Sequence, residues 1–200
     1  MAKVIHVIGN GDTASFYKPA KGLKITCNVP PFSVPDVWGT CIVDFKMMVA
    51  MNEGSVLPPG PWILGARPHK FIELNPNLRI KWMDRIRDYY TVLPKYAGNY
   101  TNFNCGHLAV HYAANKLKGE EIHMYGFDSI FDFNLRSYTD MVLNSDRGNT
   151  NNHRLANNWR PIWGEMFKEF SDTKFVLHHK HNESKVKLPE NVEVHVSSKK

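Results

Sequence analysis

The sequence predicts an α/β fold, built as one domain on a mostly parallel sheet with helices on both faces. Short apolar runs rich in β-branched residues alternate with stretches of helical periodicity, which is typical of strand–helix–strand units. The 200 residues are 42% hydrophobic and 22% charged, close to the average of globular proteins. A chain of this length buries a core without disulfides or metals, so we expect a single domain over residues 1–200.

Strands are expected where a short apolar run ends at a glycine or a polar residue. The first run ends in Gly9-Asn10-Gly11, and its continuous apolar character is that of a buried parallel strand. The strands predicted in this way are 3–8, 23–27, 40–45, 121–125, 173–177 and 192–196, with shorter ones at 62–64 and 71–74. Apolar and polar residues alternate along 192–196, which indicates an edge strand.

Three segments have the periodicity of helices. Residues 79–93 place their apolar and aromatic residues on one stripe, which predicts an amphipathic helix. Residues 104–118 form a second predicted helix, with Asn104 as its N-cap and Gly119 just past its end. A third helical stretch follows His153, and Pro161 requires that it kink there or start anew near Arg160.

The net charge and the cysteine content indicate which kinds of partner and which cellular compartment to expect. The chain carries a net charge of +6 and has a pI near 9.2, which favours anionic partners. Its apolar runs are too short for a membrane span, and Gly9 breaks the N-terminal run too early for a signal peptide. The three cysteines are widely spaced and form no disulfide or zinc pattern, so we expect a cytoplasmic protein. The sequence does not set the oligomeric state, and a homo-oligomer is compatible with it.

Ligands of parallel sheets bind at the carboxyl ends of the strands, so the residues there are the candidates for a binding site. These residues are Gly9, Asn10, Gly11, Thr13, Asn28, Asp44, Asn104, Cys105, Gly106, Gly126, Phe127 and Asp128. Residues 9–14 match the dinucleotide pattern G-x-G-x-x-A, but Pro19 and Gly22 stop the long helix that this pattern requires. No nicotinamide or flavin cofactor is therefore expected, and the two glycines instead favour a close approach of backbone amides to an anion.

Histidines and cysteines offer several weaker hypotheses. A thiol nucleophile at Cys105 would need a base, and the spacing to His107 is not itself a dyad. His107 and His111 lie one helical turn apart but have no third metal ligand in view. In the run 178–181 only His179 and His181 would point to the same face of a strand. We assign no metal ligand from the sequence.

His153 is the best candidate for a general base. It follows the polar stretch 149–152 and stands at the start of a helix, and a histidine exchanges protons near pH 7.

The order of these motifs resembles one family of enzymes. The matching segments are 7–11 (Val-Ile-Gly-Asn-Gly), 27–28 (Cys-Asn), 104–106 (Asn-Cys-Gly), 125–128 (Tyr-Gly-Phe-Asp) and His153. In this order and spacing, over roughly residues 3–196, they resemble the bacterial sialyltransferases of glycosyltransferase family 42. The resemblance implies a Rossmann-like nucleotide-binding domain with a small lid, which would lie at about 129–152 here.

The resemblance also implies a reaction. Members of the family transfer sialic acid from CMP-sialic acid to a sugar hydroxyl, with inversion and without a metal or other cofactor. By that likeness, Asn10 and Asn28 would contact the CMP moiety and the backbone of 104–106 would cradle the donor. Asp128 would bind the ribose or order the site, and His153 would take the proton of the acceptor hydroxyl. In the lid, Tyr138 is our candidate for a hydroxyl that faces the leaving phosphate.

Two other functions stay open at this point. The first is a nucleotide-binding protein without transferase activity. The second is a basic protein that binds or modifies nucleic acid, because residues 79–96 interleave basic and aromatic side chains that can bind phosphates and stack on bases. An amphipathic helix whose aromatic rings face the core is the plainer interpretation of the same segment.

Overall fold

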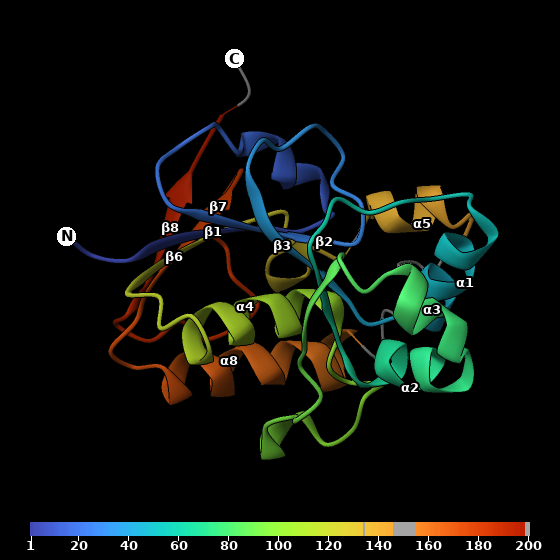
Figure 1. The fold of residues 1–200 in the computed structure, drawn as a ribbon. Helices are drawn as coiled ribbons and strands as arrows, with labels where there is room; N and C mark the ends of the chain where they lie inside the picture. Colours follow the sequence, from blue (N-terminus) through green and yellow to red (C-terminus); the bar gives the residue numbers. More distant parts are fainter. Residues whose placement is uncertain (134, 146–154, 199–200) are drawn as a thin grey trace.

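The computed structural model describes residues 1–133, 135–145 and 155–198 and confirms the α/β fold (Figure 1). Eight strands form one parallel sheet in the order β5-β4-β3-β2-β1-β6-β7-β8. Their bounds are β1 Val4–Ile8, β2 Leu23–Cys27, β3 Val37–Ile42, β4 Trp62–Leu64, β5 Ile86–Tyr89, β6 Glu121–Tyr125, β7 Lys174–His179 and β8 Val192–Val196. The prediction of an edge strand at 192–196 is confirmed, since β8 ends the sheet.

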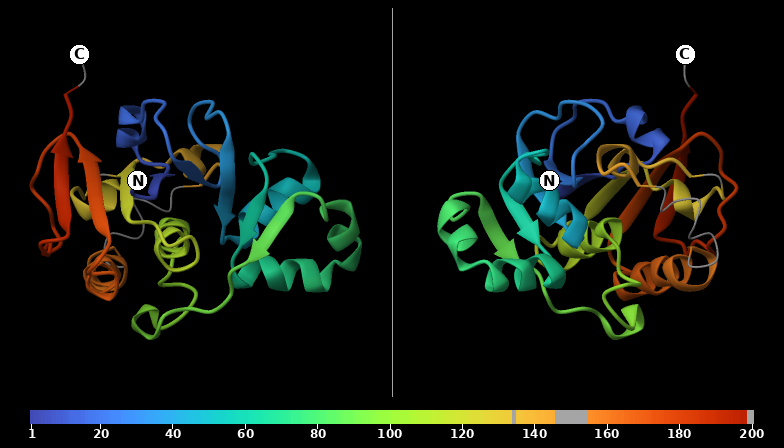
Figure 2. Two further views of the ribbon diagram at one scale, coloured as in Figure 1. Left: turned by 60° about the vertical axis from the view of Figure 1, so that its left-hand side comes forward. Right: turned by 90° about the vertical axis from the view of Figure 1, so that its right-hand side faces the viewer.

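Helices cover both faces of the sheet, as predicted. The helical elements are η1 Asp12–Phe16, α1 Phe45–Glu53, α2 Ala66–Leu74, α3 Pro76–Lys81, η2 Lys95–Ala97, α4 Cys105–Asn115, η3 Asp128–Ile130, α5 Tyr138–Val142, η4 Leu155–Trp159 and α8 Arg160–Glu169. Figure 2 shows α4 and α8 side by side along one face. On the other face, α1, α2 and α3 pack over β3 and β4, and η1 packs over β6 and β7.

The alternation of side chains along each strand divides the core into these layers. Ile5 and Val7 of β1 join the large cluster under α4 and α8, whereas Ile8 joins Ala14 and Tyr125 beneath η1. All five side chains are almost fully buried. Because successive residues of a strand point to opposite faces, the continuous apolar runs of the sequence correspond to strands covered on both sides.

The topology places a crevice beside β1. From β1 the chain adds β2, β3, β4 and β5 outward on one side, and it then returns through α4 to β6 on the other side. Loops that leave the carboxyl ends of β1 and β6 therefore run in opposite directions. A reversal of strand order of this kind is where open parallel sheets bind their ligands.

Two secondary-structure predictions are wrong. Residues 71–74 are not a strand but the end of α2, in which Pro68 and Ile72 are buried one turn apart. Residues 79–93 are not one helix, because α3 ends at Lys81 and the chain continues into β5. β5 pairs with β4 and forms hydrogen bonds with the backbone N–H and C=O groups on the outer edge of β4. This tertiary pairing overrides the helical periodicity of residues 79–93.

Other predictions needed only new boundaries. The strand expected at 40–45 runs over Val37–Ile42, and the helix expected at 104–118 ends at Asn115. Asn104 is the N-cap of α4, as predicted. The helix after the polar loop begins anew at Arg160, with Pro161 in its first turn, where the missing N–H costs no helical bond. Within the described residues, no helix is both long and apolar enough to cross a membrane.

Candidate functional site

The candidate site is a pocket of about 420 Å³ at the carboxyl edge of the sheet, over the crevice beside β1. Of the residues predicted to bind the nucleotide, all but Thr13 line it. They are Gly9, Asn10, Gly11, Asn28, Asp44, Asn104, Cys105, Gly106 and Asp128. A volume of this size is typical of pockets that hold small organic ligands. The structure thus brings together residues that lie as far as 119 positions apart in the chain.

The floor of the pocket is the contact between the loop after β1 and the loop after β6. The Gly9 N–H donates to the Tyr125 carbonyl at 2.7 Å, and the Gly11 N–H donates to the Gly126 carbonyl at 3.1 Å. A Cβ on Gly11 would lie 2.7 Å from the Gly126 oxygen and 2.6 Å from the Asp128 carboxylate. The glycines are therefore required for close backbone approach.

We expect Gly11→Ala to lower the free energy of unfolding by about 1–3 kcal/mol, the usual cost of overpacking. The added methyl group collides with backbone that cannot move without separating β1 from β6. Gly164→Ala in α8 is the control, because its Cβ would meet nothing closer than 3.9 Å. Urea denaturation measures both variants. A Gly11→Ala protein as stable as the wild type would contradict this description of the pocket floor.

Asp128 orders the same loop from the side of β6. Its carboxylate accepts hydrogen bonds from the Thr13 hydroxyl and, at 3.4 Å, from the Thr13 N–H. Thr13 is buried, and both its N–H and its hydroxyl group bond to Asp128. The sequence predicted Thr13 to bind the nucleotide, but Thr13 does not line the pocket. Of the two roles considered for Asp128, ordering the site is the one that these hydrogen bonds perform.

Asn28 offers the pocket an unused hydrogen-bond acceptor. Its backbone is left-handed, with φ of 53°, a conformation that asparagine tolerates well. The side-chain amide donates to the Thr139 hydroxyl at 3.0 Å, while Oδ1 has no hydrogen-bond partner among the described residues. Asn28 is only 3% exposed. A buried carbonyl without a partner is costly, so this atom is suited to an N–H or O–H group of a ligand.

Helix α4 presents its first turn to the pocket through Asn104, Cys105 and Gly106. The Asn104 side chain accepts the His107 N–H at 3.0 Å, and the Asn104 N–H donates to His107 Nδ1 at 3.1 Å. This reciprocal capping box fixes the start of the helix, whose dipole favours an anion there.

The thiol of Cys105 is not a nucleophile in this structure. It is buried and donates to the Cys41 carbonyl at 2.9 Å. Burial, together with the nearby Cys27 thiol, raises the pKa of Cys105 well above its usual value, so the thiol stays protonated at neutral pH.

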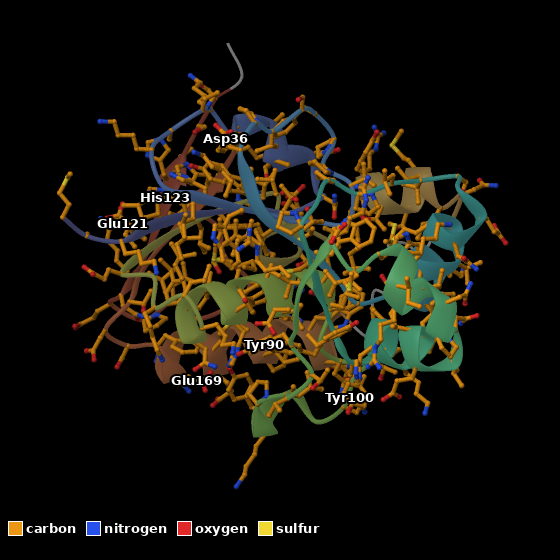
Figure 3. All side chains as sticks on the ribbon, in the orientation of Figure 1. Asp36, Tyr90, Tyr100, Glu121, His123 and Glu169 are labelled. Atoms are coloured by element: carbon orange, nitrogen blue, oxygen red, sulfur yellow. The ribbon has the colours of Figure 1, made fainter. Side chains whose placement is uncertain are left out.

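His107 and His111 are also held by protein contacts. His107 Nε2 lies 3.1 Å from the Trp159 carbonyl, in addition to its capping contact. His111 lies between the Tyr90 hydroxyl at 2.6 Å and the Glu169 carboxylate at 2.9 Å. Figure 3 labels Tyr90 and Glu169, the two partners of His111. The two histidines therefore serve separate contacts rather than a shared ligand.

The lid predicted at 129–152 is described only in part. Ser137 forms a bridge with Gly11, and the Tyr138 N–H donates to the Asn10 carbonyl at 2.9 Å. Ser137 and Thr139 line the pocket, but Tyr138 is not among the residues described as lining it. The role of its hydroxyl stays a prediction. His153 lies outside the described residues, so its role as general base stays a prediction as well.

Sequence reasoning missed the basic residues of the pocket. Lys46, Arg67 and Arg136 line it together with the acidic Asp44, Asp128 and Asp140. The Arg67 guanidinium donates to the Tyr100 carbonyl at 2.9 Å, which holds it at the rim. Arg67 follows the carboxyl end of β4, so the strand-end rule applied to residues 62–64 would have found it. Arg136 carries no such signal.

Comparisons of the chain with protein-family models, curated proteins and solved structures found no match.

Proposed function

We propose that this protein is a glycosyltransferase of the sialyltransferase type. It takes a sugar from a CMP-activated or related nucleotide-activated donor and passes it to a hydroxyl group of a glycan or another acceptor. The observation that carries the proposal is the pocket at the crevice beside β1, because each of the four motif segments that the structure describes contributes residues to its lining.

The chemistry of the pocket supports an anionic donor. In the reaction the bond between the sugar and the phosphate of CMP breaks, and negative charge develops on that phosphate. The first turn of α4, the glycine loop after β1 and the cations Lys46, Arg67 and Arg136 all border the same cavity. Groups of this kind stabilise a leaving phosphate. The unpartnered Oδ1 of Asn28 supplies an acceptor for a base or ribose group.

His153 completes the proposal as the base that takes the proton from the attacking hydroxyl. We expect His153→Ala to reduce transfer by about 10²–10⁴-fold, the usual contribution of general-base catalysis, with CMP affinity nearly unchanged. His195→Ala, which removes an exposed histidine of β8, is the control and retains activity. Release of CMP from CMP-sialic acid in the presence of a hydroxyl acceptor measures transfer. A fully active His153→Ala protein contradicts the proposed role.

The nucleic-acid hypothesis gains little from the structure. Trp82 and Tyr90, two of the rings that would stack on bases, are buried at 4% and 8% exposure. Arg87 lies over the ring of Trp38, with 4.2 Å from its guanidinium carbon to the ring centroid. These rings serve the core rather than an exposed stacking surface. A nucleotide-binding protein without transferase activity therefore ranks second, since it requires only the pocket.

A further inference from the structure

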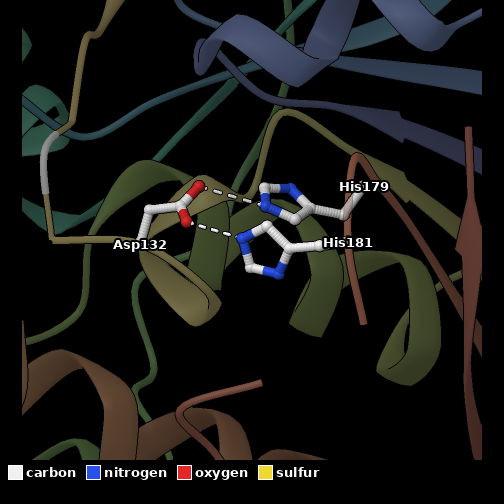
Figure 4. A group of neighbouring side chains, drawn as sticks. All are labelled: Asp132, His179 and His181. Carbon is white, nitrogen blue, oxygen red and sulfur yellow. Dashed lines mark hydrogen bonds and ion pairs between the residues drawn. The ribbon is translucent and has the colours of Figure 1, made fainter. Parts of the chain in front are cut away.

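A second cluster of polar side chains lies beside the pocket, where β6 and β7 end. Asp132 comes from the loop after η3, His179 is the last residue of β7, and His181 follows two positions later. His181 Nε2 lies 2.7 Å from Asp132 Oδ1, and His179 Nε2 lies 3.1 Å from Asp132 Oδ2. Figure 4 shows both rings directing a nitrogen at the one carboxylate. The three ligand atoms lie within 4.8 Å of one another.

His179 lies between two carboxylates. Its Nε2 lies 3.1 Å from Asp132 Oδ2, and its Nδ1 lies 3.5 Å from Asp128 Oδ1 but makes no hydrogen bond to any described residue. The imidazole is fully buried and stacks on Phe131 with ring centroids 4.0 Å apart. Burial and stacking hold the ring in place, so Nε2 stays directed at the Asp132 carboxylate.

The loop that carries Asp132 is held in place by other contacts. Arg160 donates from Nε to the Ser129 carbonyl at 2.8 Å and from Nη2 to the Asp132 carbonyl at 2.9 Å. The Lys185 N–H donates to the Ile130 carbonyl at 2.8 Å. The backbone that carries Asp132 is therefore held in place by contacts other than the two histidines. A preformed set of ligands lowers the cost of binding an ion.

One neighbouring cation opposes an ion at this group. The Lys180 ammonium lies 3.6 Å from Asp132 Oδ2 and would repel an ion. Its side chain is 60% exposed, so it is free to turn into solvent.

We propose that Asp132, His179 and His181 bind one divalent transition-metal ion. Two imidazole nitrogens and one carboxylate oxygen are a donor set suited to zinc and its neighbours in the first transition row. The side chain of His181 is 31% exposed, which leaves open positions for water on the ion. Such an ion would link the loop after β6 to the end of β7. Its ligand His179 lies next to Asp128, which lines the pocket. This site is independent of the proposed transfer reaction.

The test is calorimetric titration of the metal-free protein with zinc chloride. We expect one zinc per chain, with affinity lowered at least about tenfold in Asp132→Asn and in His181→Ala. Neither change removes a core side chain, and circular dichroism verifies that both variants fold. Absence of zinc binding by the wild type overturns the proposal.

A matched control is available on the opposite face of the sheet, around His178, the neighbour of His179 in β7. His123 lies 2.6 Å from Glu121 and 2.8 Å from His178, so it belongs to a group of the same composition (Figure 3 labels Glu121 and His123). We expect His123→Ala to bind zinc as the wild type does. If His123→Ala loses the ion while Asp132→Asn and His181→Ala keep it, the metal binds the other group and the proposal is wrong.

Discussion

Replacing Asn28 by glycine is expected to weaken the binding of CMP by roughly tenfold or more, the value of one to two hydrogen bonds at a buried site. The substitution removes the amide whose Oδ1 lacks a partner in the pocket wall. It leaves the left-handed backbone at φ of 53° unstrained, because glycine adopts this region freely. Calorimetric titration with CMP measures the effect.

Asn144→Gly is a closely matched control for this prediction. Asn144 is also an asparagine in the left-handed region, with φ of 48°, but it is exposed. It is not among the residues described as lining the pocket. CMP affinity in this variant stays at the wild-type level. If Asn28→Gly, Asn144→Gly and the wild type bind CMP with equal affinity, Asn28 does not contribute to CMP binding.

The protein is expected to lose stability as the pH falls below about 6.5, and His107 is a main cause. Burial lowers the pKa of His107 to about 3, and the hydrogen bond to the Trp159 carbonyl offsets this only in part. In the unfolded chain a histidine has a pKa near 6.5. Between these values the unfolded state holds a proton that the folded state does not, so protons favour unfolding. The slope for one such group reaches about 1.4 kcal/mol per pH unit.

The structure gives a local reason for this behaviour as well. Nδ1 of His107 accepts the Asn104 N–H, so a proton there would break the capping box of α4. His178 acts in the same direction, because burial and then the neighbouring His123 lower its pKa to about 4. The loss of stability is therefore present from about pH 6.5 downward.

His107→Gln isolates the contribution of His107. Glutamine occupies the third position of standard capping boxes, so it preserves the contact to Asn104 and removes the titrating group. We expect a shallower fall in the urea midpoint between pH 7 and 5 than in the wild type. His69→Gln, at a half-buried position of α2, is the control for a change from histidine to glutamine. The same slope in His107→Gln and the wild type would contradict the assignment.

The sheet could be predicted because its signals are local. Parallel strands that are covered on both faces are continuously apolar, and the run 3–8 has this character. The prediction of one helix over residues 79–93 was wrong because the same apolar and aromatic residues can also form an edge strand. Only the unpaired edge of β4 decides between the two, and a sequence does not show which edge is free.

The site was predictable to the same extent. Residues that follow parallel strands share one edge of the sheet, so the glycine loop, Asn28 and Asp128 were found by position alone. The contacts that determine their roles are non-local. Thr13 reaches Asp128 across 115 positions, and Asp132 meets His179 across 47. Sequence periodicity does not reveal such pairs, and for this reason the sequence did not point to Asp132, the proposed metal ligand.

Calorimetric titration of the wild-type protein with CMP, beside UMP, GMP and NAD, tests the central claim most directly. The account predicts selective binding of CMP with a micromolar dissociation constant. The pocket would combine N–H groups and cations that bind the phosphate with a hydrogen-bond acceptor for the base or the ribose. Heats of dilution alone across the panel would contradict it, and the pocket would then not be a nucleotide site.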